Sequence, residues 1–167
     1  DSKLYRGAAD GTAQLLLAVS GSVAISADGS TVYYSSGNTL TIHTLQTGAA
    51  ISVDMGANIS KLSSMTGGVA VATVTGDMMD CEMGWGSCES NIHLVSTAGT
   101  ITASQKLDDM LRGMAVQSSS SGDTLVLAVS KSCGEGNSSW STMPIHPVDL
   151  SFVSDNELNC LNIDECA

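Results

Sequence analysis

Hydrophobic and polar residues alternate in short stretches over residues 22–53, and small residues that favour turns separate these stretches. Runs of β-branched and aromatic residues with a period of two are typical of β-strands. Gly and Asn in the intervening turns, as at Gly37-Asn38, adopt positive φ at little cost. The pattern predicts four consecutive strands, at 23–26, 31–36, 39–45 and 49–53, that form one antiparallel sheet.

The same order of strands and turns recurs further along the chain. An Ile-His pair marks the third strand of each unit, with its histidine at His43, His93 and His146, a period of about 50 residues that lies in the range of β-propeller blades. The second strands, at 69–74 and 124–129, are nearly continuous apolar runs, as expected where both faces of a sheet are covered. First strands are predicted at 59–63 and 114–117, and last strands at 100–104 and 149–153.

These units predict an all-β, β-propeller-like fold with about three and a half four-stranded antiparallel blades, which is fewer than the usual ring needs. Residues 1–158 would form this domain, with a partial blade at 1–19 and full blades at 20–55, 56–106 and 107–156. Residues 159–167 would be a linker and the start of another module. A short helix is predicted at 105–112, and two inserted loops at 77–89 and 132–141.

Charge and hydropathy narrow the classes of partner. The chain has 17 acidic and 6 basic residues and a formal net charge of −11, which repels nucleic acid and anionic membranes. No apolar run reaches the roughly 20 residues that a membrane-spanning helix needs. Because the chain begins with Asp1 and not Met, we expect a processed product or a piece of a longer polypeptide.

Five cysteines and two N-glycosylation triplets, at Asn58 and Asn137, indicate an extracellular, oxidising setting. Cys81 and Cys88 have a spacing that suits a disulfide closing a small loop. Cys133 is then expected to pair with Cys160, although sequence does not determine that connectivity.

Three further groups of residues each have two interpretations. The acidic residues of the first inserted loop, Asp77, Asp80, Glu82 and Glu89, form a solvated surface or bind calcium. Trp85 in the same loop is an anchor for a partner or covers the adjacent disulfide. The three Ile-His histidines pack between blades or bind a metal ion, and their place on third strands, away from a central channel, favours packing.

The first full unit resembles the WD-repeat and related propeller proteins. The residues that carry this resemblance are Ser26-Ala27-Asp28-Gly29, Leu40 to Leu45 and Gln46-Thr47-Gly48. His43 stands where that family has Trp, and Thr44 where it has Asp, so the resemblance implies a divergent propeller.

The C-terminal residues Asn162-Ile163-Asp164-Glu165-Cys166 resemble the opening of a calcium-binding EGF-like module. The resemblance implies that Asn162, the Ile163 carbonyl and Glu165 bind calcium, and that Cys166 is the first EGF cysteine. The remaining ligand and cysteines of such a module are not in this chain, so the calcium site would be incomplete here.

No catalytic constellation stands out, and the predicted first strands carry no carboxylate that could bind calcium at a propeller axis. We therefore expect a non-enzymatic structural or adhesive module of a large secreted or cell-surface EGF-containing glycoprotein. Its partners would be other protein chains or copies of itself. The plan resembles flagellar-hair (mastigoneme) filament proteins and lipoprotein-receptor-like ectodomains. The alternative is a propeller-class hydrolase of the lactonase-like kind.

Overall fold

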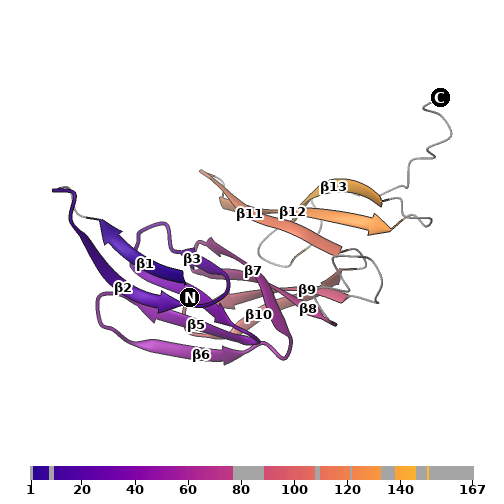
Figure 1. Cartoon of the computed structure of the whole chain (residues 1–167). Coiled ribbons are helices and arrows are strands. Elements are labelled where there is room, and N and C mark those ends of the chain that lie inside the picture. Colours follow the sequence, from indigo (N-terminus) through magenta and orange to yellow (C-terminus); the bar gives the residue numbers. More distant parts are fainter. Residues whose placement is uncertain are drawn as a thin grey trace.

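A computed structural model describes residues 2–7, 10–76, 89–107, 110–120, 122–132, 138–145 and 150. Within these residues the chain is all-β, with antiparallel pairing throughout (Figure 1). The strands are β1 (Ser2–Gly7), β2 (Ala13–Val19), β3 (Val23–Ile25), β4 (Thr31–Ser36), β5 (Thr39–Thr44), β6 (Ala50–Asp54), β7 (Asn58–Met65), β8 (Gly68–Thr75), β9 (Glu89–Ser96), β10 (Ile101–Leu107), β11 (Met110–Ser119), β12 (Gly122–Ser132) and β13 (Ser138–Ile145).

Consecutive strands pair with one another, so each sheet is built from one continuous part of the chain. Sheet 1 is β1–β2, sheet 2 is β3–β6, sheet 3 is β7–β10 and sheet 4 is β11–β13. Tight turns reverse the chain between strands, and Gly37 (φ 59°) and Gly67 (φ 78°) supply the positive φ that such turns require. Local pairing of this kind gives four-stranded antiparallel sheets for two of the three predicted full blades, and the third has the three strands β11–β13 within the described residues.

The strands predicted between residues 23 and 129 are confirmed, most closely the strand at 31–36, which is β4. Two predictions about connections are wrong. The helix expected at 105–112 does not form, because 105–107 continue β10 and 110–112 begin β11. There Leu107 and Leu111 are both buried in the core, so the apolar spacing reflects packing of strands and not a helical face.

The second inserted loop is shorter than predicted. Pairing between β12 and β13 continues as far as Ser132 opposite Ser138, so residues 132 and 138–141 of the expected loop 132–141 belong to strands. Of the last strand expected at 149–153, the structure describes only Leu150. This residue lies outside the strands and is buried at 1% exposure in the core between sheets 3 and 4.

Sheet 3 lies between sheets 2 and 4 and packs against both. Alternate residues of β8 face opposite ways: Val69 and Val71 join the core with sheet 2, whereas Ala70 and Ala72 join the core with sheet 4. All four are fully buried. The continuous apolar run of this strand therefore reflects burial on both faces, as its sequence predicted.

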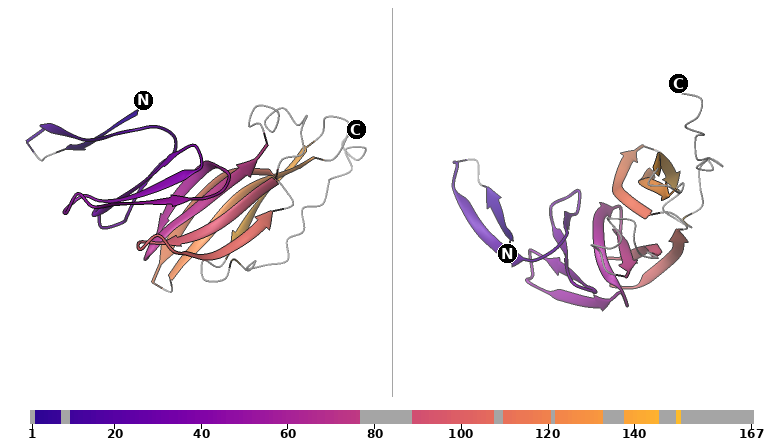
Figure 2. Two further views of the ribbon diagram at one scale, coloured as in Figure 1. Left: turned by 90° about the horizontal axis from the view of Figure 1, so that it is seen from below. Right: turned by 45° about the vertical axis from the view of Figure 1, so that its right-hand side comes forward.

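The sheets follow one another along an arc from β1–β2 to β11–β13 (Figure 2, right). In sheets 3 and 4 the first strand makes the contact with the preceding sheet, whereas sheet 2 contacts sheet 1 through β4 and β2. β7 contacts β3, β4 and β5 of sheet 2, and β11 contacts β7 and β9 of sheet 3. From sheet 2 to sheet 4 the same sheet-on-sheet arrangement thus places the first strands β7 and β11 at equivalent positions.

Candidate functional site

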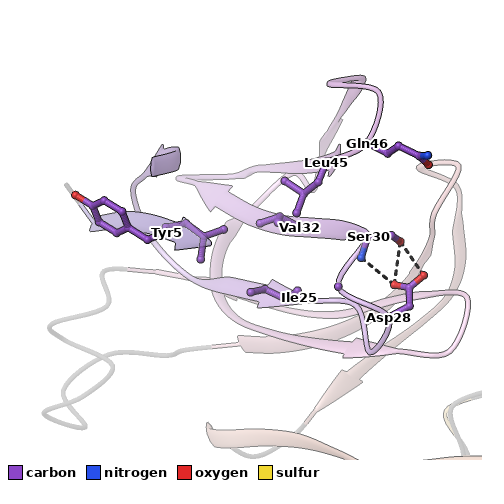
Figure 3. A pocket seen from close by; sticks show the side chains of 9 residues that line it. Tyr5, Ile25, Asp28, Ser30, Val32, Leu45 and Gln46 are labelled. Carbon is purple, nitrogen blue, oxygen red and sulfur yellow. Dashed lines mark hydrogen bonds between the residues drawn. The ribbon is translucent and has the colours of Figure 1, made fainter. Parts of the chain in front are cut away.

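A cleft of about 590 Å³ lies between sheet 1 and the outward face of sheet 2 (Figure 3). One wall comes from β1, and the other comes from β3, β4 and the turns that follow β3 and β5. The lining residues are Leu4, Tyr5, Ile25, Asp28, Gly29, Ser30, Val32, Leu45 and Gln46. The cleft exists because the sheet-on-sheet packing that buries both faces of sheet 3 covers only part of this face of sheet 2.

The walls of the cleft are mainly apolar. Val32 is fully buried at its base, whereas Ile25 is 43% exposed and Tyr5 is 51% exposed. Leu4 and Tyr5 are consecutive in β1 and yet both line the cleft, because the register of β1 against β2 shifts between them. Such a bulge re-aims a side chain that would otherwise point to the opposite face.

Asp28 provides the fixed charge of the cleft. Its Oδ1 accepts hydrogen bonds from Ser26 Oγ at 2.6 Å, Ser30 N at 3.0 Å and Ser30 Oγ at 2.9 Å. The Ser26 hydroxyl, followed by the Ser30 amide and hydroxyl, lowers the pKa of this carboxyl to about 2. Asp28 is therefore ionised at any physiological pH, and its position is set by the turn that it stabilises.

The carboxylate and the apolar walls together suit the cleft to bind a ligand that has both a positive charge and an apolar group. The carboxylate attracts a cation, and Ile25, Val32 and Leu45 offer surface to an apolar group. Among the described residues, neither a histidine nor a cysteine lines the cleft. The cleft could not be predicted from the sequence, because its two walls belong to different sheets and come together only in the tertiary structure. Tyr5 and the Asp28-Gly29 turn are the residues of the cleft that carry a signal in the sequence, and the turn by itself indicates only a strand reversal.

A second polar cluster lies on sheet 3 and centres on His93. Its Nδ1 is 2.7 Å from Ser104 Oγ and its Nε2 is 3.1 Å from Thr73 Oγ1, so the ring bridges β8, β9 and β10. Burial lowers the pKa of the imidazole, which favours the neutral form. A serine hydroxyl beside a neutral imidazole is one part of a nucleophilic site, although Thr73 stands where such sites usually have a carboxylate.

The two described histidines of the Ile-His pairs lie on third strands, as predicted. His43 is on β5 and His93 on β9, and the preceding Ile42 and Ile92 are buried at 2% and 0% exposure. The two positions are equivalent, but only His93 has the hydrogen-bonded bridge described above. His146 lies outside the described residues.

Most residues of the predicted sites lie outside the described part of the chain. These are Trp85, Asn137, the cysteines Cys81, Cys88, Cys133, Cys160 and Cys166, and the calcium ligands Asn162, Ile163 and Glu165. Asn58 is described, and it is exposed at the start of β7. Of the acidic loop, only Glu89 is described, and its Oε1 accepts a 2.6 Å ion pair from Lys106 on β10.

The described residues contain neither a cluster of metal ligands nor a membrane-spanning helix. Among these residues, His, Cys, Asp and Glu form no group of three or more that could hold a metal ion. A helix with the length and hydropathy to cross a membrane does not occur in the ranges that the structure describes.

Neither a scan against protein-family models nor a search of the curated proteins finds a match to this chain. The resemblances to propeller and EGF-like proteins therefore rest on their motifs, and both remain predictions. What can be argued about function comes from the arc of sheets, from the cleft and from the His93 cluster.

Proposed function

We propose that this chain is a structural or adhesive protein-interaction module, built as part of a β-propeller-like ring, in a large secreted or cell-surface glycoprotein. The observation that carries the proposal is the unequal covering of equivalent faces. Both faces of sheet 3 are closed by neighbouring sheets, whereas the face of sheet 2 toward sheet 1 keeps an open apolar cleft. An exposed apolar surface beside a fixed charge is typical of an interaction site.

The propeller-like part of the proposal draws support from the repeated geometry. Sheets 2 and 3 are four-stranded meanders, and each passes the chain from its last strand to the first strand of the following sheet. Continued in the same sense, such an arc closes into a ring with 4 to 8 blades. Further blades would come from additional chain or from another molecule.

The extracellular part of the proposal draws support from composition and from Asn58. A glycosylation acceptor must be accessible, and Asn58 is exposed. The five cysteines and the EGF-like start, with its implied calcium ligands, fit the same setting. Intact mass of the secreted chain, before and after reduction and deglycosylation, tests this part. A mass unchanged by both treatments would contradict it.

The interaction part of the proposal is tested by photo-crosslinking in cells that secrete the chain. Benzoylphenylalanine would replace Tyr5 in the cleft or, in separate variants, the exposed residues Thr47 and Ile101 on other surfaces. We expect a light-dependent adduct with a protein from at least one of these positions. A chain that gives no protein adduct from any of them would not be an interaction module.

The Ser104–His93 contact favours a second candidate, a hydrolase that uses the Ser104 hydroxyl as a nucleophile. A simple assay separates the two functions. If the chain cleaves p-nitrophenyl acetate and Ser104→Ala abolishes the activity, the hydrolase stands. If the rates of the two proteins equal that of buffer, the interaction module remains.

A further inference from the structure

The strands at the edges of the four sheets differ in how they are protected against pairing with another chain. An edge strand presents unpaired backbone groups, and a very short length, a break in register, a basic residue or a proline discourages pairing there. Within the described residues, every edge strand except β6 has at least one of these features. They are the length of 3 residues in β3, register breaks in the pairings of β2, β7, β10 and β11, Lys3 and Arg6 in β1, and Pro144 in β13.

β6 has none of these features. It pairs with β5 in unbroken register, and it lies below β5 at the lower border of the molecule in Figure 1. Its whole four-stranded sheet belongs to the continuous described range 10–76. Its one charged residue, Asp54, is held by its own molecule, because Oδ1 accepts hydrogen bonds from Asn38 Nδ2 and Gly56 N, both at 2.9 Å. The outer edge of β6 is therefore open to pairing.

The ladder between β5 and β6 determines which backbone groups face this edge. At one end of the ladder Thr44 N donates to Ala49 O at 2.8 Å, and at the other end Met55 N donates to Asn38 O at 2.9 Å. Hydrogen-bonded pairs alternate with non-hydrogen-bonded pairs in an antiparallel ladder. The odd-numbered residues of β6 therefore bond to β5, and the even-numbered residues direct their N–H and C=O groups to the free edge.

We infer that β6 pairs edge to edge, in antiparallel orientation, with β6 of a second copy of this chain, about a two-fold axis at Ser52. The inference rests on the proposed function and names its partner. In this register Ser52 lies opposite Ser52 of the second copy, and Ala50 lies opposite Asp54 of the second copy, both as hydrogen-bonded pairs. All outward backbone groups of β6 then have partners, and sheet 2 continues into sheet 2 of the second copy.

The distribution of charge favours a second copy as the occupant. The chain has a net charge of −11, so two copies repel each other wherever their acidic surfaces meet. Residues 39–53, which include β5, the following turn and most of β6, contain no Asp, Glu, Lys or Arg. The antiparallel register also places the two Asp54 residues at opposite ends of the paired strands. Two copies joined through β6 thus meet where each molecule is uncharged.

Ile51 adds apolar surface to the same contact. Its side chain is 42% exposed, although it packs beside Gly99 of the β9–β10 turn. In the proposed register it lies opposite Val53 of the second copy in a non-hydrogen-bonded pair, where side chains on neighbouring strands are closest. Cross-strand pairs of β-branched residues stabilise a sheet, so pairing of the edges also covers exposed aliphatic surface.

The test is sedimentation velocity of the full 167-residue chain over a range of concentrations. We expect a reversible dimer that Ser52→Lys and Ser52→Glu each weaken about tenfold, because like charges then face each other across the axis. An equal mixture of the two variants should restore the dimer, because Lys then faces Glu. Ser52→Thr is the matched control and should leave the affinity unchanged. Ser52→Lys also makes the chain less acidic, so general repulsion between copies cannot explain a weaker dimer.

A backbone variant tests the pairing itself. Ser52→Pro removes the N–H that faces the free edge and leaves the bonds of β6 to β5 in place, as edge strands allow. It should weaken the dimer about tenfold, since each copy loses one donor at the axis. Added salt should strengthen the native dimer, because it screens the repulsion between two acidic molecules.

Three outcomes would overturn the inference. They are a chain that sediments as a monomer at every concentration, a dimer that Ser52→Lys and Ser52→Pro leave unchanged, and Lys and Glu variants whose mixture forms no more dimer than either alone. The proposed function is judged separately. A monomeric chain that still forms light-dependent adducts with a different protein would be an interaction module without this self-pairing.

Discussion

At the residue scale, His93 shows how a single polar side chain can depend on burial. The ring hydrogen-bonds to Thr73 on β8 and to Ser104 on β10, so its neutral form holds three strands together. Burial lowers the imidazole pKa, which means that the folded chain takes up a proton less readily than the unfolded chain does.

This linkage predicts a loss of stability in mild acid. Between the lowered pKa and the unfolded value of about 6.5, the unfolded chain binds more protons, so the free energy of unfolding falls as pH falls. The contribution should be fully present above about pH 6.5. Urea denaturation at several pH values checks it, with His93→Gln as the comparison. A variant that keeps the whole pH dependence of the native chain would refute the assignment.

At the scale of elements, close backbone approach and turn-to-turn contacts decide how strands and sheets meet. Gly68 begins β8 at a point where a Cβ atom would lie 2.2 Å from the Val95 carbonyl oxygen of β9. Asp123, beside the β11–β12 turn, accepts a hydrogen bond from Thr66 N of the β7–β8 turn at 2.5 Å and from Ser118 Oγ at 2.7 Å. The Gly68–Val95 approach sets how β8 and β9 pair, and the Thr66–Asp123 hydrogen bond joins sheet 3 to sheet 4.

Gly68→Ala should therefore be clearly destabilising. The atoms nearest to the added methyl group are backbone atoms of Val95 and Ser96, which cannot move without disturbing the β8–β9 ladder. We expect a cost of at least about 2 kcal/mol in the free energy of unfolding, in the range of overpacked sites. Gly7→Ala is the control, because a Cβ there meets nothing within 4 Å. Similar urea midpoints for the two variants would contradict the prediction.

Asp123→Ala should weaken the contact between sheets 3 and 4. The substitution removes the acceptor of the Thr66 amide, and at this exposed position we expect a cost of about 1 kcal/mol. The same hydrogen bonds lower the pKa of Asp123, with the Thr66 amide as the main cause, so native stability should also fall as pH drops below about 3.8. Asp10→Ala, which affects only the local bonds to Thr12, is the comparison in thermal denaturation.

At the scale of the whole molecule, sheet 3 couples two cores. One core joins it to sheet 2 around Tyr33, Leu40 and Val71, and the other joins it to sheet 4 around Ala72, Leu125 and Leu127. Because β8 contributes side chains to both cores from its opposite faces, a substitution that destabilises one core should also destabilise the other. Nearest-neighbour coupling of this kind is the rule in stacked repeats.

Leu40→Ala and Leu127→Ala should each destabilise the complete stack. Both side chains are fully buried, and we expect each truncation to cost about 2 to 5 kcal/mol. Hydrogen exchange measured by mass spectrometry should show sheets 2, 3 and 4 losing protection together in either variant. Loss confined to the sheet that carries the substitution would show that the sheets unfold independently.

The sequence predicted most of the strands because pairing here is local. Alternation of apolar and polar residues predicted where the strands lie, and Gly-containing turns such as Gly37-Asn38 predicted where the chain reverses. The apolar run of β8 predicted that both faces of this strand are covered. The helix predicted at 105–112 failed because the spacing of Leu107 and Leu111 fits a helix as well as two buried strand ends. Both leucines are buried in the core between sheets 3 and 4, and the chain forms strands there because that core is made by packed sheets.

The sequence alone determined the all-β class and the order of the strands, since both follow from contacts between neighbours along the chain. Only the tertiary structure decided which faces of the sheets are covered, because that depends on residues tens of positions apart. The cleft beside Ile25 and the bridge from Thr73 through His93 to Ser104 are of this second kind. No local pattern marks Ile25 as exposed and Ile59 as buried, since each needs only an apolar side chain on a first strand.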